Sequence, residues 1–123
     1  MKQIILGSVL AVVAVTSMSA HAASSTFCAG GSAAASAVTA VSGSASFVKV
    51  DFSPKCSANV LLAGDDNSAT VFRVGSASTK GKTRFNGSSI GGAVGNAGLC
   101  GGTNNACVAG SDEAAALAAA PSS

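Results

Sequence analysis

Four cysteines constrain this chain more than any other feature: Cys28, Cys56, Cys100 and Cys107. An even set in so short a chain would form two disulfides in an oxidising compartment, and three pairings are possible. We expect Cys28–Cys56 and Cys100–Cys107, because neighbours in sequence close the smallest loops. The alternatives are a redox pair and a metal held by four thiolates. A C-x-x-C spacing would favour redox chemistry, whereas six residues separate Cys100 from Cys107.

The N-terminal residues have the three parts of a secretory signal peptide in the usual order. A positive start, Met1-Lys2, precedes an apolar run over residues 4–15 and a small-residue site at Ala20-His21-Ala22. A run of about 12 residues is too short to cross roughly 30 Å of hydrocarbon. We therefore expect cleavage after Ala22, a periplasmic, secreted or cell-surface protein of bacterial type, and no membrane span afterwards.

Removal of residues 1–22 changes the chemistry that the chain can perform. His21 is the only histidine, so its loss excludes a Ser-His-Asp triad, a Cys-His pair and the usual imidazole zinc sites. Of seven basic residues Lys2 is also lost, which leaves six against five acidic ones and a net charge of +1. A nucleic-acid binder needs a strongly basic face, so the sequence predicts no nucleic-acid partner. We also expect no metal and no cofactor.

Short alternating segments predict a mainly β domain. Residues 47–52 place Val48, Val50 and Phe52 on one face and charged residues on the other, which is the period of a half-buried strand. Further strands are expected over residues 58–63 and 69–74, separated by a turn over residues 64–67. A hairpin over residues 82–90 would turn at Asn86-Gly87. This spacing predicts a small antiparallel sandwich or barrel with two disulfides.

The remaining segments are less regular. Residues 36–41 would suit either a strand or a helix, and residues 91–110 read as a glycine-rich loop. Residues 111–123 predict a short alanine-rich helix or a flexible tail, with Ser111 as the cap and two acids in the first turn. The expected organisation is a signal peptide over residues 1–22, a disulfide-stapled β domain over 23–110, and this terminal segment.

The best candidate binding residues form one basic run with an aromatic beside it: Lys80, Lys82, Arg84 and Phe85. They could bind an anionic ligand. Alternatively, the lysines lie on a solvated hairpin and prevent its edge from pairing with other strands. A phosphate loop is a poor match, because five residues rather than four separate Gly75 from Gly81.

Catalysis would have to depend on carboxylates: Asp51, Asp65, Asp66, Asp112 and Glu113. A sugar-cleaving site needs two facing carboxylates and a cleft. The chain has no Trp and no Tyr to line such a cleft, and its last two acids fall in the expected terminal segment. Asp65, Asp66 and Asn67 could contribute oxygens to calcium. The full calcium-loop motif is absent, and a plain turn accounts for these three residues. We therefore expect no enzyme.

The leading hypothesis is an exported structural or interaction protein, such as a self-associating surface or fibre subunit. Low charge and small side chains suit association through exposed strand edges. Its partners would then be further copies of itself or other envelope components. The alternative is a monomeric periplasmic or secreted module that binds an anionic ligand through residues 80–84.

Overall fold

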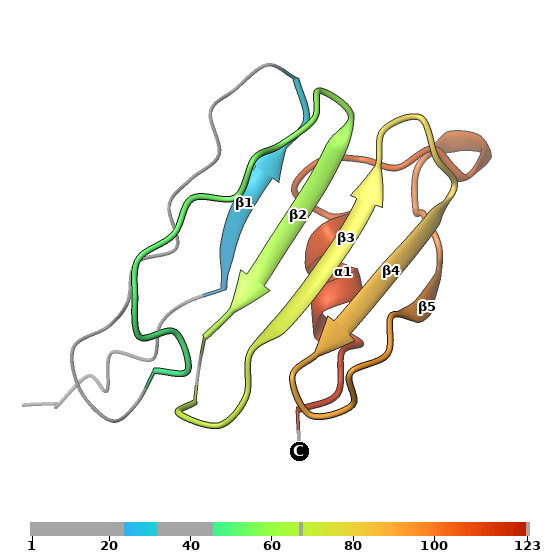
Figure 1. The fold of residues 1–123 in the computed structure, drawn as a ribbon. Helices are drawn as coiled ribbons and strands as arrows, with labels where there is room; N and C mark the ends of the chain where they lie inside the picture. Colours follow the sequence, from blue (N-terminus) through green and yellow to red (C-terminus); the bar gives the residue numbers. More distant parts are fainter. Residues whose placement is uncertain (1–23, 32–45, 67, 123) are drawn as a thin grey trace, which may run out of the picture.

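The structure is a computed structural model that describes residues 24–31, 46–66 and 68–122. Its strands form one antiparallel sheet in which the order in space follows the order in the chain (Figure 1). The expected mainly β class is confirmed, and the layer packed against the sheet is a helix. The elements are β1 (Ser25–Ala29), β2 (Val60–Asp65), β3 (Arg73–Ser78), β4 (Thr83–Ser88), β5 (Gly95–Leu99), a 3-10 turn η1 (Thr103–Asn105) and α1 (Asp112–Ala118).

Both expected disulfides are confirmed. Cys28–Cys56 links β1 to the segment that precedes β2, and Cys100–Cys107 closes the loop that follows β5. All four half-cystines are buried or half-buried. The second pair packs with Leu61 and Ala77, so it forms part of the core between the sheet and α1.

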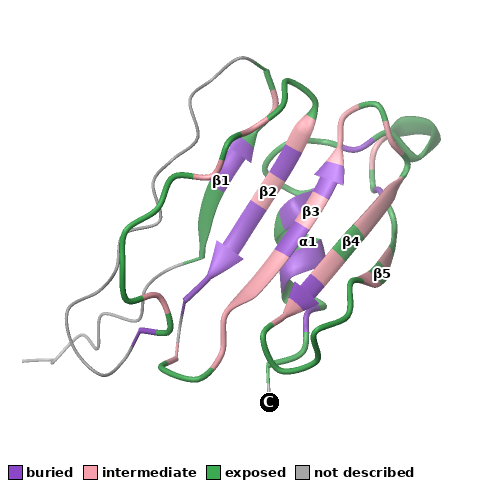
Figure 2. Ribbon diagram, viewed as in Figure 1, coloured by how far each residue is buried: buried purple, intermediate pink, exposed green. Residues whose placement is uncertain are grey.

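Small side chains allow α1 to lie close against β3. A methyl group at Gly75 would overlap the backbone of Glu113 and Leu117, so only glycine permits this approach. Ala116 and Leu117 of α1 are buried, as is Leu61 of β2, and α1 contacts both β2 and β3. Figure 2 shows buried residues in β1, β2, β3 and α1. The alanine- and glycine-rich composition thus builds a thin, closely packed core.

The other face of the sheet is covered unevenly. Over β1 and β2, Val48 and Cys56 pack against Phe27 and Cys28. Over β3, β4 and β5, no element of the described ranges covers the sheet face that points away from α1 (Figure 1). We call this uncovered part the open face.

The strand expected over residues 47–52 is wrong. The Phe47 and Val48 N–H groups donate to the Asp66 carboxylate, and the Ser46 hydroxyl also bonds to it. The segment is therefore held by one side chain, in place of a strand ladder. Val50 is 76% exposed, so the alternation of this segment does not reflect a buried face.

The turn expected over residues 64–67 and the strand over 69–74 are also misplaced. Gly64 and Asp65 end β2, which begins two residues later than expected, and β3 begins only at Arg73. Gly64 serves packing, because a side chain there would overlap the Phe27 ring. Asp65 is opposite Arg73 in the ladder and forms an ion pair with it.

The Asn86-Gly87 hairpin is wrong as well, since β4 runs through both residues. Gly75 pairs with Asn86 and Val74 with Gly87, so this dipeptide is in the middle of the sheet. The chain reverses afterwards, where Gly92 has a φ of 65°. The expected loop over residues 91–110 contains β5 and η1.

The terminal segment forms α1, which packs on the sheet. Ser111 makes no side-chain cap bond. The expected signal peptide and the uncertain segment over residues 36–41 lie outside the described residues. Among the helices of the described ranges, none is long and apolar enough to cross a membrane.

Candidate interaction surface

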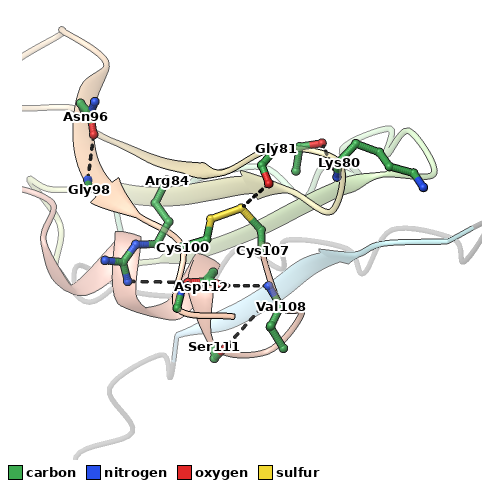
Figure 3. Close-up of a disulfide and its surroundings, with 12 residues drawn as sticks. Lys80, Gly81, Arg84, Asn96, Gly98, Cys100, Cys107, Val108, Ser111 and Asp112 are labelled. Carbon is green, nitrogen blue, oxygen red and sulfur yellow. Dashed lines mark hydrogen bonds and ion pairs between the residues drawn. A yellow bond between two sulfur atoms is a disulfide. The ribbon is translucent and has the colours of Figure 1, made fainter. Parts of the chain in front are cut away.

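The four predicted binding residues are divided between the two faces of the sheet. Lys80 and Lys82 are exposed on either side of Gly81, where β3 turns into β4. Phe85 pairs with Ser76 on the open face. Arg84 instead points toward α1, where a guanidinium nitrogen lies 3.8 Å from an Asp112 oxygen (Figure 3). The structure therefore brings Lys82 and Phe85 together and places Arg84 elsewhere.

Lys82 and Phe85 line a shallow hollow of about 410 Å³, which we call the Lys82 hollow. Strands β2, β3 and β4 contribute its walls and floor. Phe85 is 44% exposed, so its ring forms an accessible apolar wall. The lining residues are Val60, Ser76, Ala77, Ser78, Gly81, Lys82, Thr83 and Phe85.

A second hollow of about 240 Å³ lies further along β3 and β4. It is bordered by the stacked rings of Phe47 and Phe72, whose centroids are 6.3 Å apart. Val74 and Val94 add further apolar surface. The open face thus carries two apolar depressions beside each other on the same strands.

Four of the five carboxylates are buried, and each is used inside the fold. Asp65 pairs with Arg73, and Asp66 binds the segment around Phe47. Glu113 accepts the Gly110 N–H through Oε1 at 2.7 Å, whereas its Oε2 has no partner within the described ranges. These carboxylates do not line either hollow.

Asp112 holds both ends of the Cys100–Cys107 loop. Its Oδ2 accepts the Val108 N–H at 2.7 Å (Figure 3), and its Oδ1 accepts the Gly101 N–H at 2.9 Å. The ligand atoms of Asp112 and the two cysteines all lie within 4.8 Å of one another. The sulfurs are joined in a disulfide, so in the oxidised protein this group acts as a structural clamp.

Burial of the acids alters the surface charge. Asp51 is the exposed carboxylate, while the exposed lysines are Lys49, Lys55, Lys80 and Lys82. The exposed charges of the described residues are therefore more positive than the net charge of +2 suggests. No sequence pattern indicates this burial directly, although adjacent acids beside a glycine-rich loop could have indicated acceptors for loop N–H groups.

The edge of β5 is the feature that sequence analysis missed most completely. β5 ends the sheet order, and its five residues contain no charged side chain and no proline. Leu99, which pairs with Thr83, is 58% exposed. Proteins normally protect such an edge with charge, proline or a covering element. Gly98 interrupts regular geometry with a φ of 95°, and its N–H bonds to the Asn96 side chain (Figure 3).

No protein-family model, curated protein sequence or solved structure matches this chain.

Proposed function

We propose that this chain is an exported, non-enzymatic interaction protein that associates with a second copy of itself through the β5 edge. The observation that carries the proposal is the uncharged terminal strand, with exposed Leu99 at its end. Export is supported by the N-terminal pattern and by the two disulfides, which suit an oxidising compartment.

A second copy is the occupant that this edge fits best. A strand added beside β5 would form backbone hydrogen bonds with it, and no charged side chain of β5 would be buried. Pairing of β5 with β5 would give a closed dimer, whereas pairing of β5 with the other terminal strand, β1, would give an open chain of subunits. β1 also has no charged residue.

The test is light scattering on the oxidised protein as it leaves a sizing column. The wild-type protein should have the mass of two or more subunits, and Leu99→Lys should shift it toward the monomer. The matched control is Val108→Lys, which adds the same charge at a 46% exposed valine beyond the sheet. If the wild-type protein is monomeric throughout, or both variants dissociate equally, association through β5 is wrong.

A second candidate function is the binding of an anionic ligand at the β3–β4 turn. The observation that favours it is that Lys82 borders a hollow that no carboxylate lines. Neither Lys80 nor Lys82 has an ion pair in the described part of the chain. This candidate predicts salt-sensitive binding that disappears in Lys80→Ala/Lys82→Ala, while self-association persists in that variant.

A further inference from the structure

We propose that the Lys82 hollow binds a single-chain anionic amphiphile, with its alkyl chain along the apolar walls and its carboxylate at Lys82. The inference rests on the second candidate function and names its ligand class. It does not depend on self-association, because the lining comes from β2, β3, β4 and the β3–β4 turn, and Leu99 is not part of it.

The apolar part of the site is large relative to its charged part. Val60 and Phe85 supply carbon surface from β2 and β4, on either side of the β3 residues Ser76 and Ser78. A volume of about 410 Å³ lies within the range of small-molecule sites, which is roughly 300–1,000 Å³. Most of the binding free energy must therefore come from removing alkyl surface from water.

The polar groups are positioned for an anionic head. Lys82 is the charged lining residue, and Ser78 and Thr83 add hydroxyls near it in the chain. The Ser78 Oγ accepts the Lys80 N–H at 3.4 Å, which leaves its own proton able to donate. The side chains of Ser76 and Thr83 have no hydrogen-bond partner in the described ranges. A cation together with hydroxyl donors complements a carboxylate.

This arrangement fits an amphiphile better than a small ion or a polyanion. One ammonium group in an open hollow provides little affinity for a bare ion, because exposed pairs contribute little in water. A polyanion would need a row of cations, whereas Arg84 is turned away toward Asp112. A dissolved amphiphile with one alkyl chain and one carboxylate would contact both the apolar walls and Lys82.

The experiment is calorimetric titration of the oxidised protein with sodium dodecanoate below its micelle concentration. Acetate tests the head alone, and dodecyltrimethylammonium tests the chain with the opposite charge. Dodecanoate should bind about tenfold or more tighter than either, and decanoate about tenfold more weakly than dodecanoate if both lost methylenes are buried.

Three variants locate the site. Lys82→Gln should remove the preference for dodecanoate over dodecyltrimethylammonium, and Ser76→Leu should block both by filling the hollow. The control is Lys55→Gln, an exposed lysine outside the lining, which should bind dodecanoate as wild type does. Amide NMR spectra establish that each variant is folded.

The outcomes separate this inference from the function on which it rests. If acetate binds as tightly as dodecanoate and Lys82→Gln abolishes both, the anionic site stands and the amphiphile is wrong. If no probe binds, both are wrong. Binding that survives Ser76→Leu in a folded protein, or binding only to phosphatidylglycerol vesicles and never to dissolved dodecanoate, also overturns the inference.

Discussion

Arg84 and Phe85 are neighbours in sequence and lie on opposite faces of the sheet. Arg84 approaches Asp112 at the start of α1, and Phe85 borders the Lys82 hollow on the open face. The alternation of side chains along β4 accounts for this separation, because successive residues of a strand point to opposite sides. The Arg84 side of β4 therefore packs toward α1, while the Phe85 side lies on the open face.

The clamp formed by Asp112 should be a main source of stability for the loop after β5. Asp112→Ala removes the acceptor of the Gly101 and Val108 N–H groups, so we expect the free energy of unfolding to fall by about 1–3 kcal/mol. Urea denaturation followed by circular dichroism measures this change. Ser111→Ala is the neighbouring control and should change it by less than about 0.5 kcal/mol. Equal losses in the two variants would contradict the clamp.

Gly75 should tolerate substitution far less well than Gly87. Gly75→Ala forces α1 away from β3 and should lower the free energy of unfolding by about 1–3 kcal/mol. Gly87→Ala places a methyl 3.4 Å from Val74 on the open side, so stability should stay level or rise by up to about 1 kcal/mol. Thermal unfolding of both variants decides the matter. A harmless Gly75→Ala would show that the helix does not pack so closely.

The two disulfides should differ in their contribution to stability. Loop-closure entropy assigns about 3.6 kcal/mol to Cys28–Cys56 and about 2.5 kcal/mol to Cys100–Cys107. Replacement of both cysteines of a pair by serine should lower the free energy of unfolding by less than about 2.5 kcal/mol at Cys100–Cys107, since Asp112 still holds both ends of that loop. A larger loss at Cys100–Cys107 than at Cys28–Cys56 would contradict this order. Peptide mapping under non-reducing conditions checks the pairing itself.

Sequence patterns predicted the elements that depend on local chemistry. The disulfide pairing followed from short loops, and the helix from alanines preceded by two acids. The errors arose where tertiary contacts decide. Asn86-Gly87 has the composition of a turn, yet it is paired with β3. Residues 47–52 have the alternation of a strand, yet Asp66, nearly twenty residues later, holds their start.

The candidate site was predicted only in part, for the same reason. Lys82 and Phe85 were found because they lie close in the chain, but Val60 and Ser76 reach the hollow through strand pairing. The burial of Glu113 could not be read from a segment that also resembled a tail. No local pattern marks β5 as the last strand, since that position depends on the whole sheet order.

The N-terminus of the exported protein should be Ala23. Expression with its own leader, followed by intact-mass measurement of the oxidised protein, should show loss of residues 1–22 and of four hydrogens for two disulfides. A protein that retains Met1 in the envelope fraction would contradict cleavage. One that is found reduced inside the cell would contradict export.

The most direct test of the account is the mass of the oxidised wild-type protein in solution as its concentration is raised. Association through β5 predicts a mass of two or more subunits that increases with concentration. For β5–β5 pairing the mass should level off at two subunits, whereas for β5–β1 pairing it should continue to grow. A mass that stays at one subunit over the whole concentration range would contradict the proposed function.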